Sequence, residues 1–234
     1  MRITPRKLAS FAYCPSLFWS KRTLTPELTE IEDLTRLSIL AAERKSMEKG
    51  SSVIPVKIAG EWEKLWWPKA IADGLETKEI EKISFNVISK LHKYCKYDIG
   101  SSEYVTVSTD VQSEVLYNDM ILAVSADLVK ISSENIQNEL TIIDFSRKNI
   151  TSLGLSTDIE ALATASAFSG FKKTIQYITV DLSEDKKDLA ISSCSFDLDM
   201  LRAAERMIDY LSLGISKTIN FKSRDCRTCN LCLN

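Results

Sequence analysis

The amino-acid sequence predicts a mixed α/β (or α+β) fold, and a change of pattern along the chain leads to that prediction. Apolar residues recur every three to four positions through most of the first hundred residues, which is typical of helices. From residue 103 the chain turns to short runs rich in Val, Ile, Leu and Tyr, and these strands are joined by two more helices. In 234 residues with 44% apolar content, we expect a single domain, 1–234, with a sizeable core.

Three helices are expected before the sheet. Thr4 and Pro5 fit the N-cap and first position of a short helix. A second helix is predicted at 27–49 and a third at 77–97, together forming a helical part, 27–97. The predicted apolar face of the second helix consists of Leu28, Ile31, Leu34, Leu37 and Ala41.

The segment 52–76 is expected to be irregular. It contains Trp62, Trp66 and Trp67, which either form a local core or offer platforms for stacking nucleic-acid bases. The usual fate of such aromatic residues favours the core.

The sheet is expected within 103–195. Its predicted elements alternate in the second half of the chain: a hairpin of two strands turning at Asn118, a third strand, a helix, two strands and a last helix. In chain order they are 103–116, 120–131, 140–145, 158–169, 174–182, 189–195 and 198–213. Thr157 and Glu160 have the spacing of a capping box at the start of the first of these helices.

Scarce residue types exclude several functions. The seven glycines are too widely separated for a phosphate-cradling loop, and His92 is the only histidine. No apolar run approaches the roughly 20 residues of a membrane span, and the N-terminus has no secretory pattern. We therefore expect a cytoplasmic protein without a membrane partner.

Cysteine is the informative residue. Cys226, Cys229 and Cys232 form a C-x2-C-x2-C run, a spacing that iron–sulfur clusters use. Cys14, which precedes a proline, is the best candidate for a fourth ligand, and it would join the two ends of the chain. Cys95 and Cys194 lie within apolar patterns, where cysteine acts as a small hydrophobe. Zinc is the alternative metal, and a chain without metal is the third possibility.

Two aspartates interrupt apolar strands. Asp127 and Asp144 lie on consecutive predicted strands, and a carboxylate at a strand centre is costly unless it is paired or binds a metal. Together they could hold Mg²⁺ or Mn²⁺ and support phosphodiester hydrolysis. The residue two positions after Asp144 is Ser146, and the nearest lysine after Asp144 is Lys148. Alternatively, each aspartate lies at a strand end and is solvated.

The order of these motifs resembles that of a known family. Cys14-Pro15 with Phe18-Trp19, then the two strand-borne acids, then the cysteine run, are similar to the RecB-like nucleases of the PD-(D/E)XK superfamily. The resemblance is to the iron–sulfur branch that contains the Cas4-type exonucleases. It covers the whole chain and implies a restriction-endonuclease-like mixed sheet flanked by helices. It also implies a cluster lobe formed by 1–25 and 214–234.

The resemblance assigns roles unevenly. It implies a 4Fe–4S cluster on Cys14, Cys226, Cys229 and Cys232, and Mg²⁺ or Mn²⁺ on Asp127 and Asp144. The family's lysine falls at Ser146, its histidine has no counterpart near 42–48, and its Gln and Tyr fall near Glu160 and Thr164.

Because these groups are missing, three functions stay open. The first is a DNA-binding iron–sulfur protein with weak or lost nuclease activity, acting in CRISPR adaptation or DNA repair with protein partners. The alternative is an active Mg²⁺- or Mn²⁺-dependent exonuclease that uses Asp127, Asp144 and Lys148. The second alternative is a structural zinc protein within a complex.

Net charge hides an asymmetry that bears on DNA. The whole chain carries −2, but residues 1–22 carry +5 and residues 214–234 carry +3, so the remainder carries −10. DNA attraction depends on local charge, and the basic ends are those that a cluster would bring together. The predicted DNA-binding residues are Arg6, Lys7, Lys21, Arg22, Lys222, Arg224 and Arg227.

Overall fold

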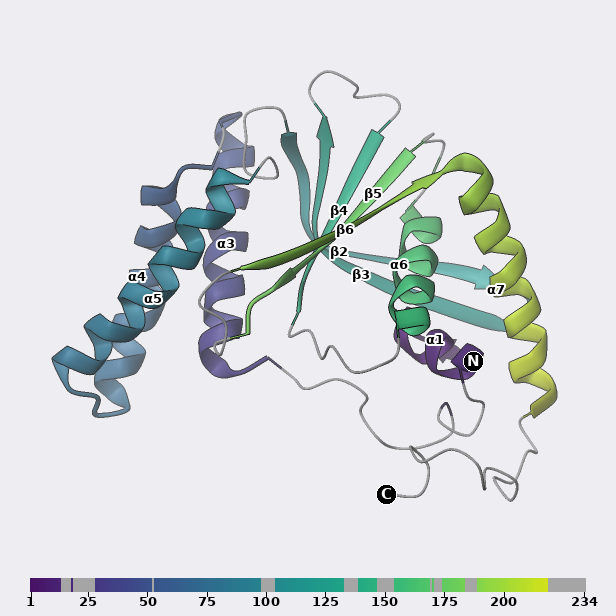
Figure 1. Ribbon diagram of the computed structural model, residues 1–234, viewed down its shortest axis with the longest axis horizontal. Coiled ribbons are helices and arrows are strands. Elements are labelled where there is room, and N and C mark those ends of the chain that lie inside the picture. Colours follow the sequence, from purple (N-terminus) through teal and green to yellow (C-terminus); the bar gives the residue numbers. More distant parts are fainter. Residues whose placement is uncertain are drawn as a thin grey trace.

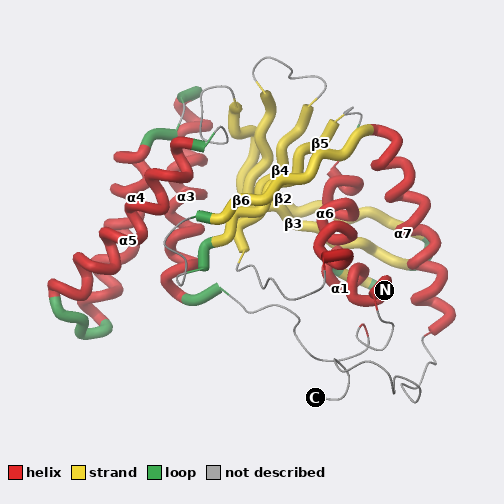
Figure 2. Tube along the Cα trace, in the orientation of Figure 1, coloured by secondary structure: helices red, strands yellow, loops and turns green. Residues whose placement is uncertain are grey.

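A mixed sheet lies between two groups of helices in the computed structural model (Figure 1). The structure describes residues 1–13, 18, 28–51, 53–97, 104–132, 139–146, 154–168, 170, 174–183 and 189–218. Within these residues the sheet has six strands, which confirms the predicted mixed α/β class. Figure 2 shows the layers, with the strands between the two sets of helices.

The strands follow the order β1-β3-β4-β5-β6, and β2 pairs with β3. The β4–β5 and β1–β3 pairs are parallel, and the other neighbours are antiparallel. The hairpin of β2 and β3 turns at Asn118, as predicted, with a left-handed φ of 52°. The strands are β1 (Arg2–Ile3), β2 (Tyr104–Tyr117), β3 (Met120–Ser132), β4 (Glu139–Ser146), β5 (Thr174–Asp181) and β6 (Ala190–Asp197).

One face of the sheet is covered by α3, α4 and α5, and the other by α1, α6 and α7 (Figure 1). The first core combines residues of α3–α5 with Leu128, Ile143 and Ile178 of the sheet. Two further cores lie under the second group of helices. The helices are α1 (Pro5–Tyr13), α3 (Glu30–Lys49), α4 (Pro55–Ala72), α5 (Thr77–Lys96), α6 (Gly154–Phe168) and α7 (Leu198–Thr218).

The predicted irregular segment 52–76 is wrong, because α4 occupies most of it. Pro55 begins this helix, where a proline's missing N–H costs nothing. Trp62 and Trp66, one turn apart, stack at 5.5 Å between ring centroids and are almost fully buried. Their burial stabilises a helix that contains Pro68, and it places both rings in the core rather than on a surface that could stack bases.

The predicted apolar face of α3 is also partly wrong. Ile31 and Leu34 do pack against the core, but Leu37 is exposed. The buried face carries polar groups, including Ser38, Glu43 and Ser46 alongside Ile39 and Ala42. A face lined with polar residues has weak apolar periodicity, so the pattern of hydrophobic residues pointed to a neighbouring stripe.

Helix ends differ from the predictions in three places. The first predicted helix is confirmed, since the Lys7 N–H donates to Thr4 Oγ1 at 3.3 Å. In contrast, α6 begins at Gly154, so Thr157 lies inside it and cannot be its N-cap. Helix α3 begins three residues later than predicted, and α7 continues to Thr218. The two-residue strand β1 was not predicted, because it is too short to show a period.

A buried ion pair joins α3 to the sheet. Lys130 Nζ lies 2.7 Å from Glu43 Oε1, and both side chains are 2% exposed. Tyr94 donates to Glu43 Oε1 at 2.7 Å and Thr106 donates to Glu43 Oε2 at 2.6 Å. Both carboxylate oxygens therefore have partners, which is the condition under which a buried charge is tolerated.

We expect Lys130→Met to lower the free energy of unfolding by about 3–5 kcal/mol, because it leaves the Glu43 carboxylate buried without its cation. Urea denaturation measures this loss. Lys64→Met provides the matched control, since Lys64 pairs with Glu61 on the surface and should contribute about 0–1 kcal/mol. Equal losses in the two variants would contradict the assigned role of the buried pair.

None of the helices in the described part of the chain is long and apolar enough to span a membrane.

Candidate functional site

Three aspartates lie at the same level of three neighbouring strands. The β2–β3 register pairs Thr109 with Leu128 and Val111 with Ala126, so Asp110 lies opposite Asp127. The β3–β4 register ends at the Leu128–Ile143 pair, and the next pair in sequence is Asp127 and Asp144. The structure thus brings the two predicted acids together.

Strands β2 and β3 are irregular where Asp110 and Asp127 lie. Asp110 has a left-handed φ of 52°, unusual for a residue other than glycine. On β3, Ala126 contributes to the core under α6, whereas Leu128 contributes to the core under α3–α5. Residues two apart share a face in a regular strand, so the alternation breaks at Asp127.

The acids replace backbone groups in the hydrogen bonding between β3 and β4. The Asp127 N–H donates to Asp144 Oδ1 at 3.3 Å, and the Phe145 N–H donates to Asp127 Oδ2 at 2.6 Å. Each carboxylate therefore accepts from the backbone of the other strand. Such bonds satisfy N–H groups that the break in the ladder would otherwise leave without partners.

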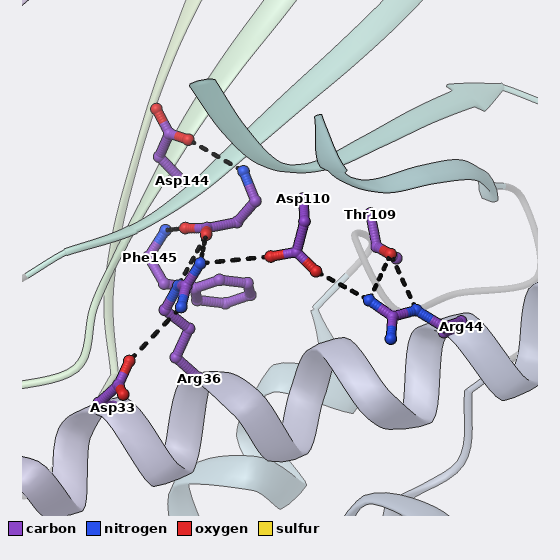
Figure 3. Close-up of polar contacts among 8 residues, drawn as sticks. Asp33, Arg36, Arg44, Thr109, Asp110, Asp144 and Phe145 are labelled. Carbon is purple, nitrogen blue, oxygen red and sulfur yellow. Dashed lines mark hydrogen bonds and ion pairs between the residues drawn. The ribbon is translucent and has the colours of Figure 1, made fainter. Parts of the chain in front are cut away.

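Arg36 of α3 pairs with Asp127. Its Nε and Nη2 atoms lie 2.7 and 2.6 Å from Asp127 Oδ1. Figure 3 shows that the same guanidinium also reaches Asp33 and Asp110, each at 3.4 Å. Arg44, two turns further along α3, holds the other oxygen of Asp110 at 2.8 Å.

Asp144 faces the opposite side of the sheet, toward α6. The Tyr177 hydroxyl donates a short hydrogen bond to Asp144 Oδ2. Burial raises the pKa of Asp144 to about 7; the Tyr177 hydrogen bond opposes this shift, and the charges of Asp127 and Glu160 add to it. Glu160 is itself paired with Arg6 of α1 at 3.3 Å. Asp144 therefore keeps its proton to a higher pH than an exposed aspartate does.

Burial also raises the pKa of Asp127, but hydrogen bonds from Arg36 and from the Phe145 N–H oppose the shift. The two acids therefore differ in environment: one has a guanidinium partner and the other has a phenol. The pKa of Tyr177 lies well above its ordinary value because of burial and the nearby charge of Asp144, so it remains a hydrogen-bond donor.

The donor set does not fit a resident divalent cation. Asp127 Oδ1 accepts the Nε–H of Arg36 and lies 2.6 Å from its Nη2, and Oδ2 accepts the N–H of Phe145, so both carboxylate oxygens already have partners. Among the residues that the structure describes, no group of three or more His, Cys, Asp or Glu side chains is arranged to hold a metal ion. A Mg²⁺ or Mn²⁺ ion would have to displace Arg36 from Asp127.

The other predicted site residues are only partly described. Arg6 and Lys7 lie on α1, where Lys7 Nζ sits 5.4 Å from the Phe18 ring centroid. Cys95 and Cys194 are half-buried free thiols against apolar clusters, as expected, and burial raises the pKa of Cys95 to about 11. Outside the described residues lie Cys14, Cys226, Cys229, Cys232, Lys148, Lys21, Arg22, Lys222, Arg224 and Arg227.

Sequence reasoning missed Arg36 and Tyr177. Arg36 lies on a helix whose buried face was assigned to other residues, and one arginine among many carries no signal of its own. Tyr177 lies within an apolar strand, where tyrosine is common. However, an acid within an apolar strand is costly to bury without a partner, and that cost indicated that partners such as Arg36 and Tyr177 must exist.

No family model matches the chain, and no curated protein sequence matches it. Solved structures with a similar course of the chain include a protein assigned as an exonuclease from Eubacterium rectale, with 12% identity and a TM-score of 0.49. That similarity covers 99% of this chain and 87% of the other. The alkaline exonuclease LHK-Exo from Laribacter hongkongensis has 8% identity and a TM-score of 0.38, with coverage of 94% and 90%. The functional argument therefore rests on the side chains described above.

We expect Asp144→Asn to flatten the pH dependence of stability. A carboxyl whose pKa is raised from 3.8 to about 7 on folding contributes stability that is complete below pH 4 and lost as pH rises through 7. Relative to the wild type, the variant should gain on the order of 1–3 kcal/mol in free energy of unfolding between pH 5 and pH 8. Urea denaturation across this range measures the gain.

Asp199→Asn is the control for this measurement, because Asp199 is exposed on α7 and its side chain is 92% accessible. It should follow the wild type at every pH. If the stability of Asp144→Asn also ran parallel to that of the wild type, the raised pKa assigned to Asp144 would be wrong.

Proposed function

We propose that this chain is a DNA-binding protein of the Cas4-type iron–sulfur nuclease class whose acid pair supports weak nuclease activity or none. The observation that carries the proposal is the Arg36–Asp127 contact, at 2.6 and 2.7 Å. A guanidinium occupies the carboxylate on which a catalytic cation would depend. A single group that is positioned to stabilise the transition state commonly accounts for a hundredfold or more in rate. Occupation of the Asp127 carboxylate by Arg36 therefore weakens catalysis strongly.

The DNA-binding part of the proposal rests on the placement of the basic N-terminal helix. Helix α1 packs beside α6 (Figure 1), and Arg6 pairs there with Glu160, whose charge acts on Asp144. Helix α1 thus adjoins the Asp144 side of the acid pair. Phosphates drawn to this helix would lie near Asp144, because local charge governs DNA attraction.

We expect labelled single-stranded DNA to bind at about 50 mM salt and to be released by 200 mM, as for other phosphate-dominated binding. Lys7→Glu should weaken binding about tenfold, whereas Lys64→Glu, on α4 across the sheet, should leave it unchanged. Fluorescence anisotropy measures both. Binding that is undetectable at low salt, or equal in the two variants, contradicts a DNA role for α1.

The competing function is an active exonuclease that uses Asp127, Asp144 and Lys148, and its supporting observation is that the β3–β4 pairing brings Asp127 and Asp144 together. A Mn²⁺-dependent digestion assay on the same DNA decides between them. Under the main proposal, the wild type degrades DNA slowly or not at all. Rapid Mn²⁺-dependent degradation that Asp144→Ala abolishes would establish the competing function instead.

The proposed cluster rests on cysteine spacing alone. Anaerobic purification should yield a brown protein with about four iron and four sulfide per chain, as a 4Fe–4S cluster requires. Cys229→Ser should lose this iron, and Cys194→Ser, whose thiol lies against an apolar cluster, should retain it. A colourless protein with one zinc per chain would support the structural zinc alternative.

A further inference from the structure

Arg36 contacts Asp127 in a way that leaves little room for a second cation. Two of its donors, Nε and Nη2, converge on the single oxygen Oδ1, while Oδ2 faces the Phe145 N–H. The Asp127 side chain is 11% exposed, so water does little to weaken this pair. The guanidinium therefore neutralises the first of the two acids at close range.

Other side chains hold the guanidinium in this position. Asp33, one turn earlier on α3, and Asp110, on β2, each lie 3.4 Å from one of its terminal nitrogens. Arg44 pairs with the second oxygen of Asp110 at 2.8 Å (Figure 3). Arg36 is thus part of a chain of alternating charges that fixes its orientation from three directions, which is more than a single surface ion pair requires.

We propose that Arg36 is a built-in cation that replaces a divalent metal ion at the Asp127–Asp144 pair and keeps the pair closed to Mg²⁺ and Mn²⁺. This inference deepens the proposed function and rests on its premise that no divalent ion is resident at the site. The residue is a positioning group: it acts through Asp127 and sets which cation that carboxylate can take.

Arginine suits this role because its charge is permanent. The guanidinium stays protonated across the accessible pH range, so a rise in pH does not release Asp127 by neutralising its partner. A divalent ion would have to displace a charge-assisted hydrogen bond and a close ion-pair contact, and leave a partly buried guanidinium without its main partner. Removing Arg36 would instead leave two carboxylates on neighbouring strands, each accepting a backbone N–H of the other strand, without a positive partner for Asp127.

The alternative role for Arg36 is purely structural, as a tie between α3 and the sheet. Both roles predict that Arg36→Gln lowers stability. Only the built-in cation predicts that the variant gains affinity for a divalent metal, because only then are the freed carboxylates positioned for one. Metal affinity is therefore the property that separates the two roles.

The experiment measures Mn²⁺ binding by electron paramagnetic resonance and by the shift in melting temperature, on the full chain without DNA. Wild-type protein should show no binding that depends on Asp144. Arg36→Gln should bind Mn²⁺ at least about tenfold more tightly, equal to about 1.4 kcal/mol, and the ion should raise its melting temperature. Adding Asp144→Ala to Arg36→Gln should abolish the gain.

Lys45→Gln is the matched control, since Lys45 lies on the same helix as Arg36 and pairs with Glu61 of α4 at 2.7 Å, outside the charge network around Asp127. It should behave as the wild type. A folded Arg36→Gln that gains no Mn²⁺ affinity overturns the proposal. So does wild-type protein that binds Mn²⁺ and loses it in Asp144→Ala, a measurement that does not need the Arg36 variant to fold. Loss of DNA binding alone would affect only the proposed function.

Discussion

The exchange of hydrogen bonds between Asp127 and Asp144 holds the centre of the sheet together where its backbone ladder is interrupted. Each carboxylate accepts an N–H from the strand that carries the other, at 3.3 and 2.6 Å. Because the bonds come from side chains, both acids are confined to the same level of the sheet. Arg36 and Tyr177 contact the two acids at this level.

The exchange also divides the two acids between the two faces of the sheet. Asp127 reaches Arg36 of α3 on one side, while Asp144 reaches Tyr177 and the neighbourhood of Glu160 on the other. One acid consequently has a full positive partner and the other shares hydrogen bonds with a phenol.

The sequence predicted the sheet well, because the strands carry strong period-two or continuous apolar patterns and the hairpin turn is marked by Asn118. It also predicted that Asp127 and Asp144 would meet, from the cost of burying each alone. It failed on α4, since Pro55 and Pro68 signal irregular chain unless the burial of Trp62 and Trp66 is known. It failed on Arg36 because the partner of a buried charge is chosen by tertiary packing, which a single sequence does not show.

Two ion pairs of opposite polarity fix the position of α3 on the sheet. Arg36 and Glu43 are seven residues apart, about 10.5 Å along a helix, and their partners Asp127 and Lys130 are three residues apart, about 10 Å along a strand. The spacings match, so both pairs form at once. A slide of α3 by two turns would bring Glu43 against Asp127, two acids in a poorly solvated place. Buried pairs add little net stability but penalise wrong registers, and here that penalty keeps Arg36 on Asp127.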